Sequence, residues 1–422
     1  MKSLKIKINK FSAIDFLVVL TLLIALYYNA YRYPLQINNT GTSPTYSETP
    51  LILKVGKYLV TLAVLLVVLA SKRTFTTRIR KAHFWYGGAW LLLIAIPVAW
   101  GLVTRNFQFI ETGFFLAPGF FFFLLSYRAY NFSSLAQVLK YTVLIGIFFN
   151  LLQIFLFLTI KRLPGLAYPD SFAVRFGSFL DDPNAFGILL ALLLGFTMIY
   201  FRGWKKKLMV VTLWLFLALT QSLTALLAVP LAFAVYQGML LLHFKRVRVR
   251  NVVLVTLAIG GVVAVVIVFL NKIIEVGTVV YLMKKGSIED HYESFLRLFQ
   301  ISWVQLAGLR PANIFSETGY VNLIANFGLP YALLYVSMIG LAIRKLFVAS
   351  LSVTEQDEKS VVFATLIYLI AFGIGMLNLP LEQVFPVNVL TGLLAAMVLS
   401  GTLDHRTHSL PANVTAQPEA HA

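Results

Sequence analysis

Long apolar runs are the feature of this sequence that most restricts its fold. About twelve such runs are bounded by charged residues, proline or glycine, and each approaches the ~20 residues that a helix needs to cross a hydrocarbon core of ~30 Å. Their approximate ranges are 13–30, 51–70, 84–103, 109–127, 136–160, 184–201, 208–220, 224–243, 252–270, 319–343, 360–377 and 384–401. Only 12% of the residues are charged, whereas soluble domains have about 25%. We therefore predict an all-α integral membrane protein with about 12 transmembrane helices, in which residues 1–422 form a single polytopic unit.

The stretch 208–243 is too long for one span and short for two. Four polar residues interrupt it: Thr220, Gln221, Ser222 and Thr224. We place a tight turn at the outer surface there, which divides the stretch into two helices.

The net charge of +18 is best explained by membrane orientation. Basic residues gather in 2–10, 71–81, 202–207 and 245–250, which fall on one side when the runs are threaded in order. Because Lys and Arg are enriched in cytoplasmic loops, this side is predicted to be cytoplasmic, with both termini there. No nucleic-acid partner is implied. Residues 402–422 are expected to form a disordered cytoplasmic tail. The first apolar run lacks a cleavage signature, so we expect it to remain as a membrane anchor.

Two outward segments are longer than ordinary connections. The first is 161–183 and the second, 271–318, precedes the tenth span. Loops of more than ~12–15 residues are usually functional or disordered, and the second keeps too many aromatic residues for disorder. Within it Tyr292, Phe295, Leu296, Phe299 and Trp303 recur at spacings of three and four, as in an amphipathic helix lying at the bilayer surface. We expect function on this outer face.

The segment RFGSFLDDPN, residues 175–184, holds the first candidate site residues. A guanidinium such as that of Arg175 suits bidentate recognition of phosphate, although an arginine at this depth also snorkels to the interface without further function. Asp182 and Asn184 stand where a helix begins. They are therefore candidates both for helix capping and for substrate binding.

The second outer loop offers a further cation and a carboxylate. Arg297 is either a second ligand for an anion or half of a surface ion pair with Glu293, four residues earlier. Glu317 begins the next helix, where it either caps the helix or acts as a general base toward a sugar hydroxyl. Residues 289–291 are a poor metal site, because three adjacent helical residues point in different directions. No metal or other cofactor is expected.

These segments resemble a known family. RFGSFLDDPN resembles the arginine-containing signature, ending in Pro-Asn, that opens a central span of the O-antigen polymerase (Wzy-type) and O-antigen ligase superfamily of membrane glycosyltransferases. LTQSLTALL, residues 219–227, resembles the family's Thr-x-Ser-Arg stretch, and residues 297–303 and 317–331 resemble its long periplasmic loop and the helix that follows. The likeness covers about residues 175–341 and includes the order and spacing of the motifs.

The resemblance implies a metal-independent, inverting glycosyl transfer from a polyprenyl-diphosphate-linked oligosaccharide donor to a lipid-linked acceptor. It assigns the donor diphosphate to Arg175 and Arg297. Where ligases carry a His-Asn pair this chain has Glu317, which favours a polymerase with Glu317 as base. Leu223 replaces the family arginine, so Arg310 or Arg162 would supply the missing cation. Tyr320, together with Asp182, Asn184 and Glu293, completes the expected substrate-binding set.

The expected function is therefore polymerisation of O-antigen or exopolysaccharide repeat units at the outer face of the cytoplasmic (inner) membrane. The lipid bilayer and a chain-length regulator protein are the expected partners. One alternative is a ligase that moves the glycan to lipid A core or another acceptor. Another is a transporter or flippase, which would favour charged residues inside the spans, and the sequence has few of them.

Overall fold

The computed structural model describes the chain in several segments. These are residues 81–105, 132–160, 169–170, 173–180, 182–244, 292–293, 295–312, 316, 318–382 and 387–399, with the single positions Leu23, Val55, Gly56, Leu59 and Glu289. The predicted spans 13–30, 51–70, 109–127 and 252–270 lie outside these residues or are described at single positions only.

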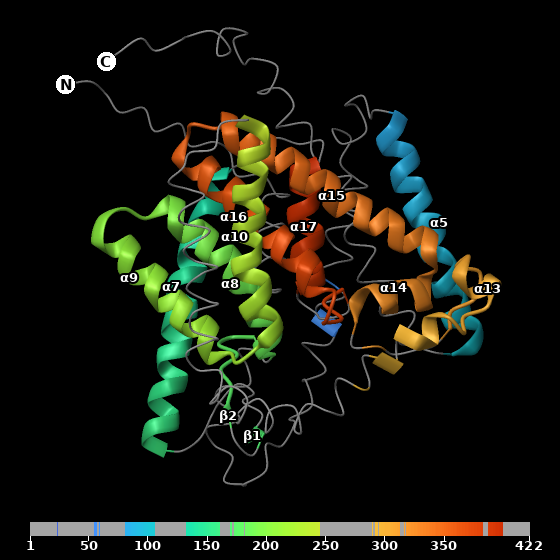
Figure 1. The fold of residues 1–422 in the computed structure, drawn as a ribbon, viewed down its shortest axis with the longest axis horizontal. Helices are drawn as coiled ribbons and strands as arrows, with labels where there is room; N and C mark the ends of the chain where they lie inside the picture. The colour runs from blue at the N-terminus through green and yellow to red at the C-terminus, as the bar shows by residue number, and fades with distance from the viewer. Residues whose placement is uncertain are drawn as a thin grey trace, which may run out of the picture.

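The described segments are almost entirely helical (Figure 1). The helices are α5 (Lys81–Thr104), α7 (Phe132–Ile160), α8 (Pro183–Tyr200), α9 (Gly203–Leu219), α10 (Leu223–Phe244), α13 (Trp303–Leu306), α14 (Gly319–Phe327), α15 (Leu329–Ser352), α16 (Gln356–Gly375) and α17 (Val387–Leu399). Two short strands, β1 (Pro169–Asp170) and β2 (Ala173–Val174), pair antiparallel with Pro169 opposite Val174. By length and composition, five of the described helices can cross a membrane: α7, α8, α10, α15 and α16.

Two interruptions of the apolar runs differ in how well the sequence predicts them. Residues 220–222 separate α9 from α10, which confirms the predicted division of 208–243. The single span predicted for 319–343 is wrong, because α14 and α15 meet at Gly328 and α15 continues to Ser352. Gly328 has φ 85° and ψ 163°, a conformation essentially restricted to glycine. Pro330, which has no N–H to donate, follows in the first turn of α15.

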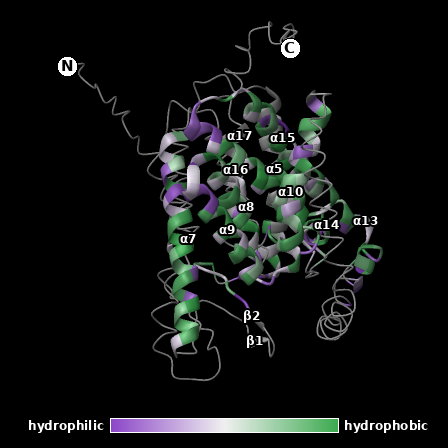
Figure 2. Ribbon diagram, turned by 60° about the vertical axis from the view of Figure 1, so that its left-hand side comes forward, coloured by the Kyte–Doolittle hydropathy of each residue, from purple (hydrophilic) through white to green (hydrophobic). Residues whose placement is uncertain are grey.

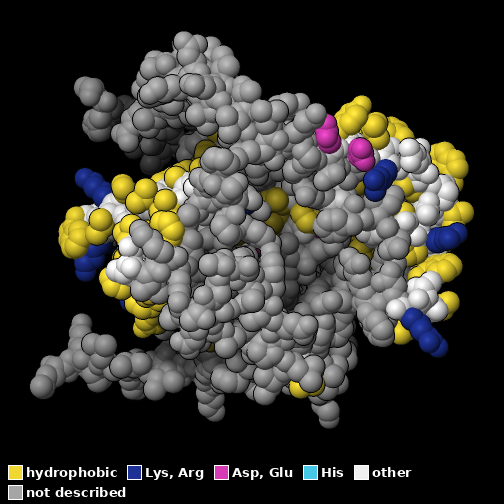
Figure 3. All heavy atoms as spheres, turned by 90° about the horizontal axis from the view of Figure 1, so that it is seen from below, with side chains coloured by type: hydrophobic (Ala, Val, Ile, Leu, Met, Phe, Trp, Pro, Cys, Tyr) yellow, Lys and Arg dark blue, Asp and Glu magenta, His cyan; other side chains and the backbone are white. Residues whose placement is uncertain are grey.

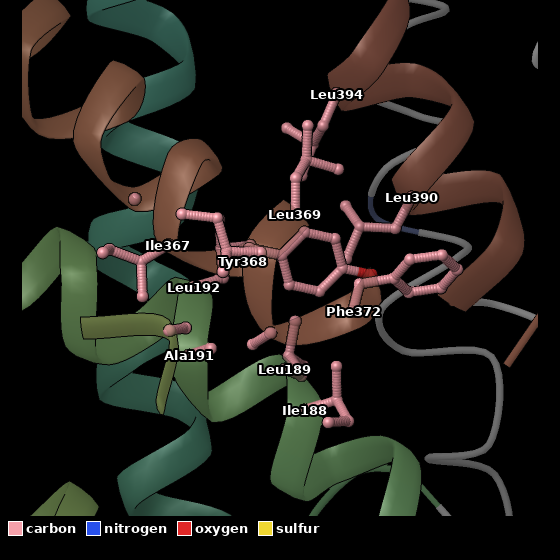
Figure 4. Close-up of a cluster of buried hydrophobic side chains, with 14 of the residues drawn as sticks. Ile188, Leu189, Ala191, Leu192, Ile367, Tyr368, Leu369, Phe372, Leu390 and Leu394 are labelled. Atoms are coloured by element: carbon pink, nitrogen blue, oxygen red, sulfur yellow. The ribbon is translucent and has the colours of Figure 1, made fainter. Parts of the chain in front are cut away.

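Helix α8 forms the centre of the described bundle. Most of its side chains are buried, and it packs mainly against α16 (Figure 4). The two helices approach closely: a Cβ on Gly195 would lie 3.0 Å from the Cα atom of Ala364. Small residues at such a crossing let the two backbones approach closely. The resulting van der Waals packing holds helices together in lipid, where the hydrophobic effect between helices is weak.

The neighbours of α8 expose apolar stripes outward. On α7 the exposed apolar side chains recur every three or four residues, which places them along one helix face. They are Tyr141, Leu144, Phe148, Leu151, Phe155 and Leu158. The helices in Figure 2 are accordingly largely hydrophobic, and most coloured side chains in the space-filling view are apolar (Figure 3). An apolar surface of this extent suits hydrocarbon and not water, so the chain is a helical membrane protein.

The bundle has two chemically different ends. Helix α8 has 18 residues and so separates its ends by about 27 Å. At one end, here called the Tyr200 end, Arg202 donates to the Gln356 side chain, whose Nε2 donates to Tyr200 O at 2.8 Å. Lys205, Lys206 and Lys207 follow there. The other, the Pro183 end, holds the hairpin, the 220–222 turn, α13 and α14 (Figure 1).

Candidate functional site

The loop of residues 175–180, which leads from β2 toward α8, is irregular but buried. Phe176, Ser178, Phe179 and Leu180 are all buried. The ring of Phe179 makes edge-to-face contacts with Phe186 at 5.8 Å and Phe149 at 6.4 Å between centroids. Aromatic contacts of this kind add to the gain from area burial. A buried loop must also satisfy its backbone polar groups, and the hydrogen bonds that do so define the site.

Arg175 joins the loop to the turn between α9 and α10. Its Nε donates to Thr220 O at 3.0 Å, and its NH2 donates to Asn184 Oδ1 at 2.6 Å. The next backbone N–H, of Phe176, donates to Leu219 O at 3.2 Å. Arg175 and Asn184, both candidates from the sequence, are thus in direct contact, and Thr220 is an additional residue of the site.

The guanidinium of Arg175 is only partly used by these bonds. A guanidinium carries five N–H donors, and the bonds to Thr220 and Asn184 engage two of them. Within the described residues, no carboxylate forms an ion pair with Arg175. The half-buried cation lies beside the N-terminus of α8, whose dipole also favours negative charge. The arrangement can therefore bind an anion at the Pro183 end.

Asp182 has the helix-capping role that the sequence left open, whereas the Asn184 side chain does not cap the helix. Asp182 is the N-cap of α8, and its Oδ1 accepts the Asn184 N–H at 2.8 Å. Pro183 follows in the first turn, where a missing N–H costs nothing. The Asn184 backbone N–H is thus capped by Asp182, while its side-chain oxygen accepts from Arg175.

A second set of bonds fixes the middle of the loop. Ser178 has φ 54°, which is unusual for a residue other than glycine. Gln153 of α7 accepts the Ser178 N–H at 3.0 Å and donates through Nε2 to Ser178 O at 3.3 Å. The Ser178 hydroxyl donates to Gly146 O at 3.3 Å. Three bonds from α7 thus hold one strained residue, as occurs at functional sites.

The 220–222 turn opposite Arg175 is similarly constrained. The Thr220 hydroxyl donates to Leu217 O at 2.7 Å and accepts the Ser222 N–H at 3.2 Å, while Gln221 has φ 49°. Leu223, where the resemblance to the glycosyltransferase superfamily would place an arginine, is 68% exposed. This apolar side chain supplies no cation to the site.

Arg297, the second arginine predicted to bind an anion, instead forms the surface ion pair with Glu293 that the sequence left as its alternative role. Arg297 donates to Glu293 Oε2 at 3.5 Å, and both side chains are more than half exposed. Arg310 lies over the Trp100 ring, with its guanidinium carbon 5.9 Å from the ring centroid, and Trp100 Nε1 donates to Leu309 O at 2.8 Å. The contacts of Trp100 attach α5 to the segment that carries Leu309 and Arg310, and both Arg297 and Arg310 are exposed.

A buried carboxylate, Glu382, lies at the N-terminus of α14. Its side chain is fully buried, and a Cβ on Gly319 would lie 2.5 Å from Glu382 Oε2. Beside it, Tyr320 donates through its hydroxyl to Gly373 O at 2.8 Å. Burial raises the pKa of the Tyr320 phenol above its usual 10.0, and the Glu382 charge raises it further. Helix dipoles stabilise negative charge at this position.

Sequence reasoning missed Glu382, Gln153 and Thr220. Glu382 had a signal, since it is the sole acidic residue between Glu358 and Asp404. Glu317 and Arg162 lie outside the described residues, as do residues 402–422. Among the residues that the structure describes, no three His, Asp or Glu side chains gather where they could hold a metal ion.

Fold and site together define a helical membrane protein with a half-buried arginine, Arg175, beside the N-terminus of α8 at one end of the bundle. Comparison of the chain with protein-family models, with curated proteins and with solved structures found no match.

Proposed function

We propose that the protein is a glycosyltransferase that polymerises polyprenyl-diphosphate-linked oligosaccharides at the outer face of the cytoplasmic membrane. The observation that carries the proposal is Arg175, which the structure holds half-buried at the N-terminus of α8 with donors to spare. A lipid-linked diphosphate reaches the protein at headgroup depth, where one end of a spanning helix lies. The resemblance of residues 175–341 to polymerases and ligases selects this anion among others.

The charge difference between the bundle ends supports the proposed orientation. Arg202 and Lys205–Lys207 lie at the Tyr200 end, whereas Arg175 lies about 27 Å away at the Pro183 end. Basic residues concentrate on the cytoplasmic side. The Pro183 end would therefore face outward, with the donor diphosphate bound there.

The proposed reaction is a single displacement. The acceptor hydroxyl oxygen attacks the anomeric carbon of the donor sugar, the bond from that carbon to the diphosphate oxygen breaks, and the diphosphate leaves with the electron pair. Glu317 takes the hydroxyl proton. Arg175 stabilises the charge that develops on the diphosphate. Arg297 would join it only after leaving its surface pair with Glu293, with Arg310 or Arg162 as the further cation and Tyr320 beside the acceptor.

The test uses purified protein in liposomes, with lipid-linked oligosaccharides extracted from a strain that lacks the gene. Glycans should lengthen in the presence of EDTA, and Arg175→Ala should abolish this. The matched control is Arg202→Ala, which removes an arginine at the Tyr200 end and should remain active. Wild-type activity in Arg175→Ala would refute the site. Transfer of glycan to lipid A without chain growth would indicate the ligase instead.

One observation favours a transporter or flippase as the second candidate. The break between α14 and α15 at Gly328 and the buried Glu382 resemble features of transporters, which combine discontinuous helices with intramembrane carboxylates. Movement of lipid-linked oligosaccharide across the liposome membrane, without any new glycosidic bond, would support this candidate.

A further inference from the structure

We propose that Gln153 of α7 is a positioning residue that aims the Arg175 guanidinium at its anionic ligand. The inference rests on the proposed function, since it names the residue that organises the same site. Gln153 comes from a different helix, α7, and its side chain is hydrogen-bonded to Ser178 of the loop that carries Arg175.

The contact between Gln153 and Ser178 is reciprocal. The Gln153 oxygen accepts the Ser178 N–H at 3.0 Å, and the Gln153 nitrogen donates to the Ser178 carbonyl at 3.3 Å. Both residues are fully buried. One side-chain amide therefore satisfies both backbone groups of a residue that has no regular helix or strand partner. A carboxamide suits this role because it presents a donor and an acceptor in one plane without carrying charge.

The geometry explains why this contact bears on Arg175. Ser178 lies three residues after Arg175 and has φ 54°, a conformation that a serine adopts only when its surroundings impose it. Besides the Gln153 bonds, the loop is held at Phe176 by Leu219 O, at Ser178 by the hydroxyl bond to Gly146 O, and at Phe179 by aromatic contacts. If the amide were lost, the buried N–H and C=O of Ser178 would lose their hydrogen bonds to Gln153. The loop would then relax, and the position of Arg175 would shift with it.

A neighbouring residue provides the matched control. Asn150 lies three residues before Gln153 on α7, is equally buried and also carries an amide. Its Nδ2 donates to Gly146 O at 2.8 Å, within its own helix. Replacing Asn150 thus removes a buried amide from α7 without removing a bond to the loop.

The test measures binding of inorganic pyrophosphate to the purified full-length protein by titration calorimetry, on monodisperse fractions only. Compared are the wild type, Gln153→Met, Gln153→Asn, Asn150→Leu, Arg175→Ala and the double variant Gln153→Met/Arg175→Ala. Methionine preserves the shape of glutamine without its hydrogen bonds. Asparagine keeps the amide but is too short to reach Ser178, and it serves if the methionine variant does not fold.

We expect pyrophosphate affinity to fall about tenfold or more in both Gln153 variants, since misplacement by an ångström has large effects. Asn150→Leu should bind like the wild type. The double variant should bind no more weakly than Arg175→Ala, because Gln153 acts only through Arg175. Such non-additivity distinguishes positioning from general stabilisation.

Two results would overturn the inference. One is wild-type affinity in the Gln153 variants while Arg175→Ala has lost binding, which would leave the proposed function intact. The other is an additive loss in the double variant. If instead Arg175→Ala binds pyrophosphate and transfers glycan like the wild type, the proposed function itself fails.

Discussion

The contact between Gly308 and Gly328 allows a sharp test of how the second outer loop is attached to the bundle. Both glycines have positive φ, 80° and 85°. A Cβ on Gly328 would lie 2.4 Å from the Cα and N atoms of Gly308, and a Cβ on Gly308 would lie 2.6 Å from Phe327 O. The two backbones therefore touch directly. No other residue type fits at either position without movement of the loop away from α14.

The magnitude for Gly328→Ala follows from two costs. A non-glycine residue in this backbone region costs about 1–3 kcal/mol, and forcing a methyl group into a packed contact costs about 1–3 kcal/mol more. We therefore expect a loss of about 2–6 kcal/mol in the free energy of unfolding. The matched control is Gly340→Ala on α15, where a Cβ would meet nothing within 4 Å. In the interior of a helix this change should stabilise by up to about 1 kcal/mol.

The assay is thermal unfolding of both variants in detergent, combined with limited proteolysis of the second outer loop. Gly328→Ala should melt at a lower temperature and be cleaved faster, while Gly340→Ala should melt at or above the wild-type temperature. The reasoning is refuted if the two variants melt together, because the same substitution would then be insensitive to backbone conformation and to the contact with Gly308.

Three further predictions concern individual side chains. Arg297→Ala should lower stability by less than about 0.5 kcal/mol in chemical denaturation, because its ion pair with Glu293 is exposed; a larger loss would mean that the pair is not the surface contact seen here. Trp100→Phe removes the bond to Leu309 O and should cost about 1 kcal/mol, with faster proteolysis near residue 309 as the readout. Because the pKa of Tyr320 is raised above 10.0, its phenol stays neutral in the folded protein at a pH where the unfolded chain ionises. Stability should therefore fall as the pH rises above about 10. Tyr320→Phe should reduce this fall, measured as the melting temperature.

Particular residues show where sequence reasoning succeeds on the fold and where it stops. The turn between α9 and α10 is predictable because Thr220, Gln221 and Ser222 interrupt an apolar run with polar side chains. Hydropathy does not reveal the break at Gly328, since apolar residues lie on both sides of it; Gly328 and Pro330 are the only local signal of a helix end there. A hydropathy pattern reports side chains, whereas this break arises from backbone conformation and from contact with Gly308.

The residues of the candidate site also fall into those that the sequence predicts and those that only the fold reveals. Arg175, Asp182 and Asn184 share one motif, and the structure brings them together. The acceptor that Arg175 uses at the 220–222 turn is a backbone carbonyl, which leaves no trace in residue type. Gln153 is one of three side-chain amides in a long apolar helix, and only the fold shows that it reaches Ser178 while Asn150 does not.

The burial of α8 has a consequence for the order in which the protein is made. Its principal partner, α16, follows far along the chain, and the closely packed Gly195 and Ala364 are 364 − 195 = 169 residues apart. At about 5–20 residues per second, α16 leaves the ribosome roughly 10–35 s after α8. During that interval the surface of α8 that later contacts α16 must be covered by lipid or by the insertion machinery. The largely apolar sequence of α8 is therefore needed until α16 has been synthesised. A polar substitution that the finished bundle could tolerate would still impair biogenesis.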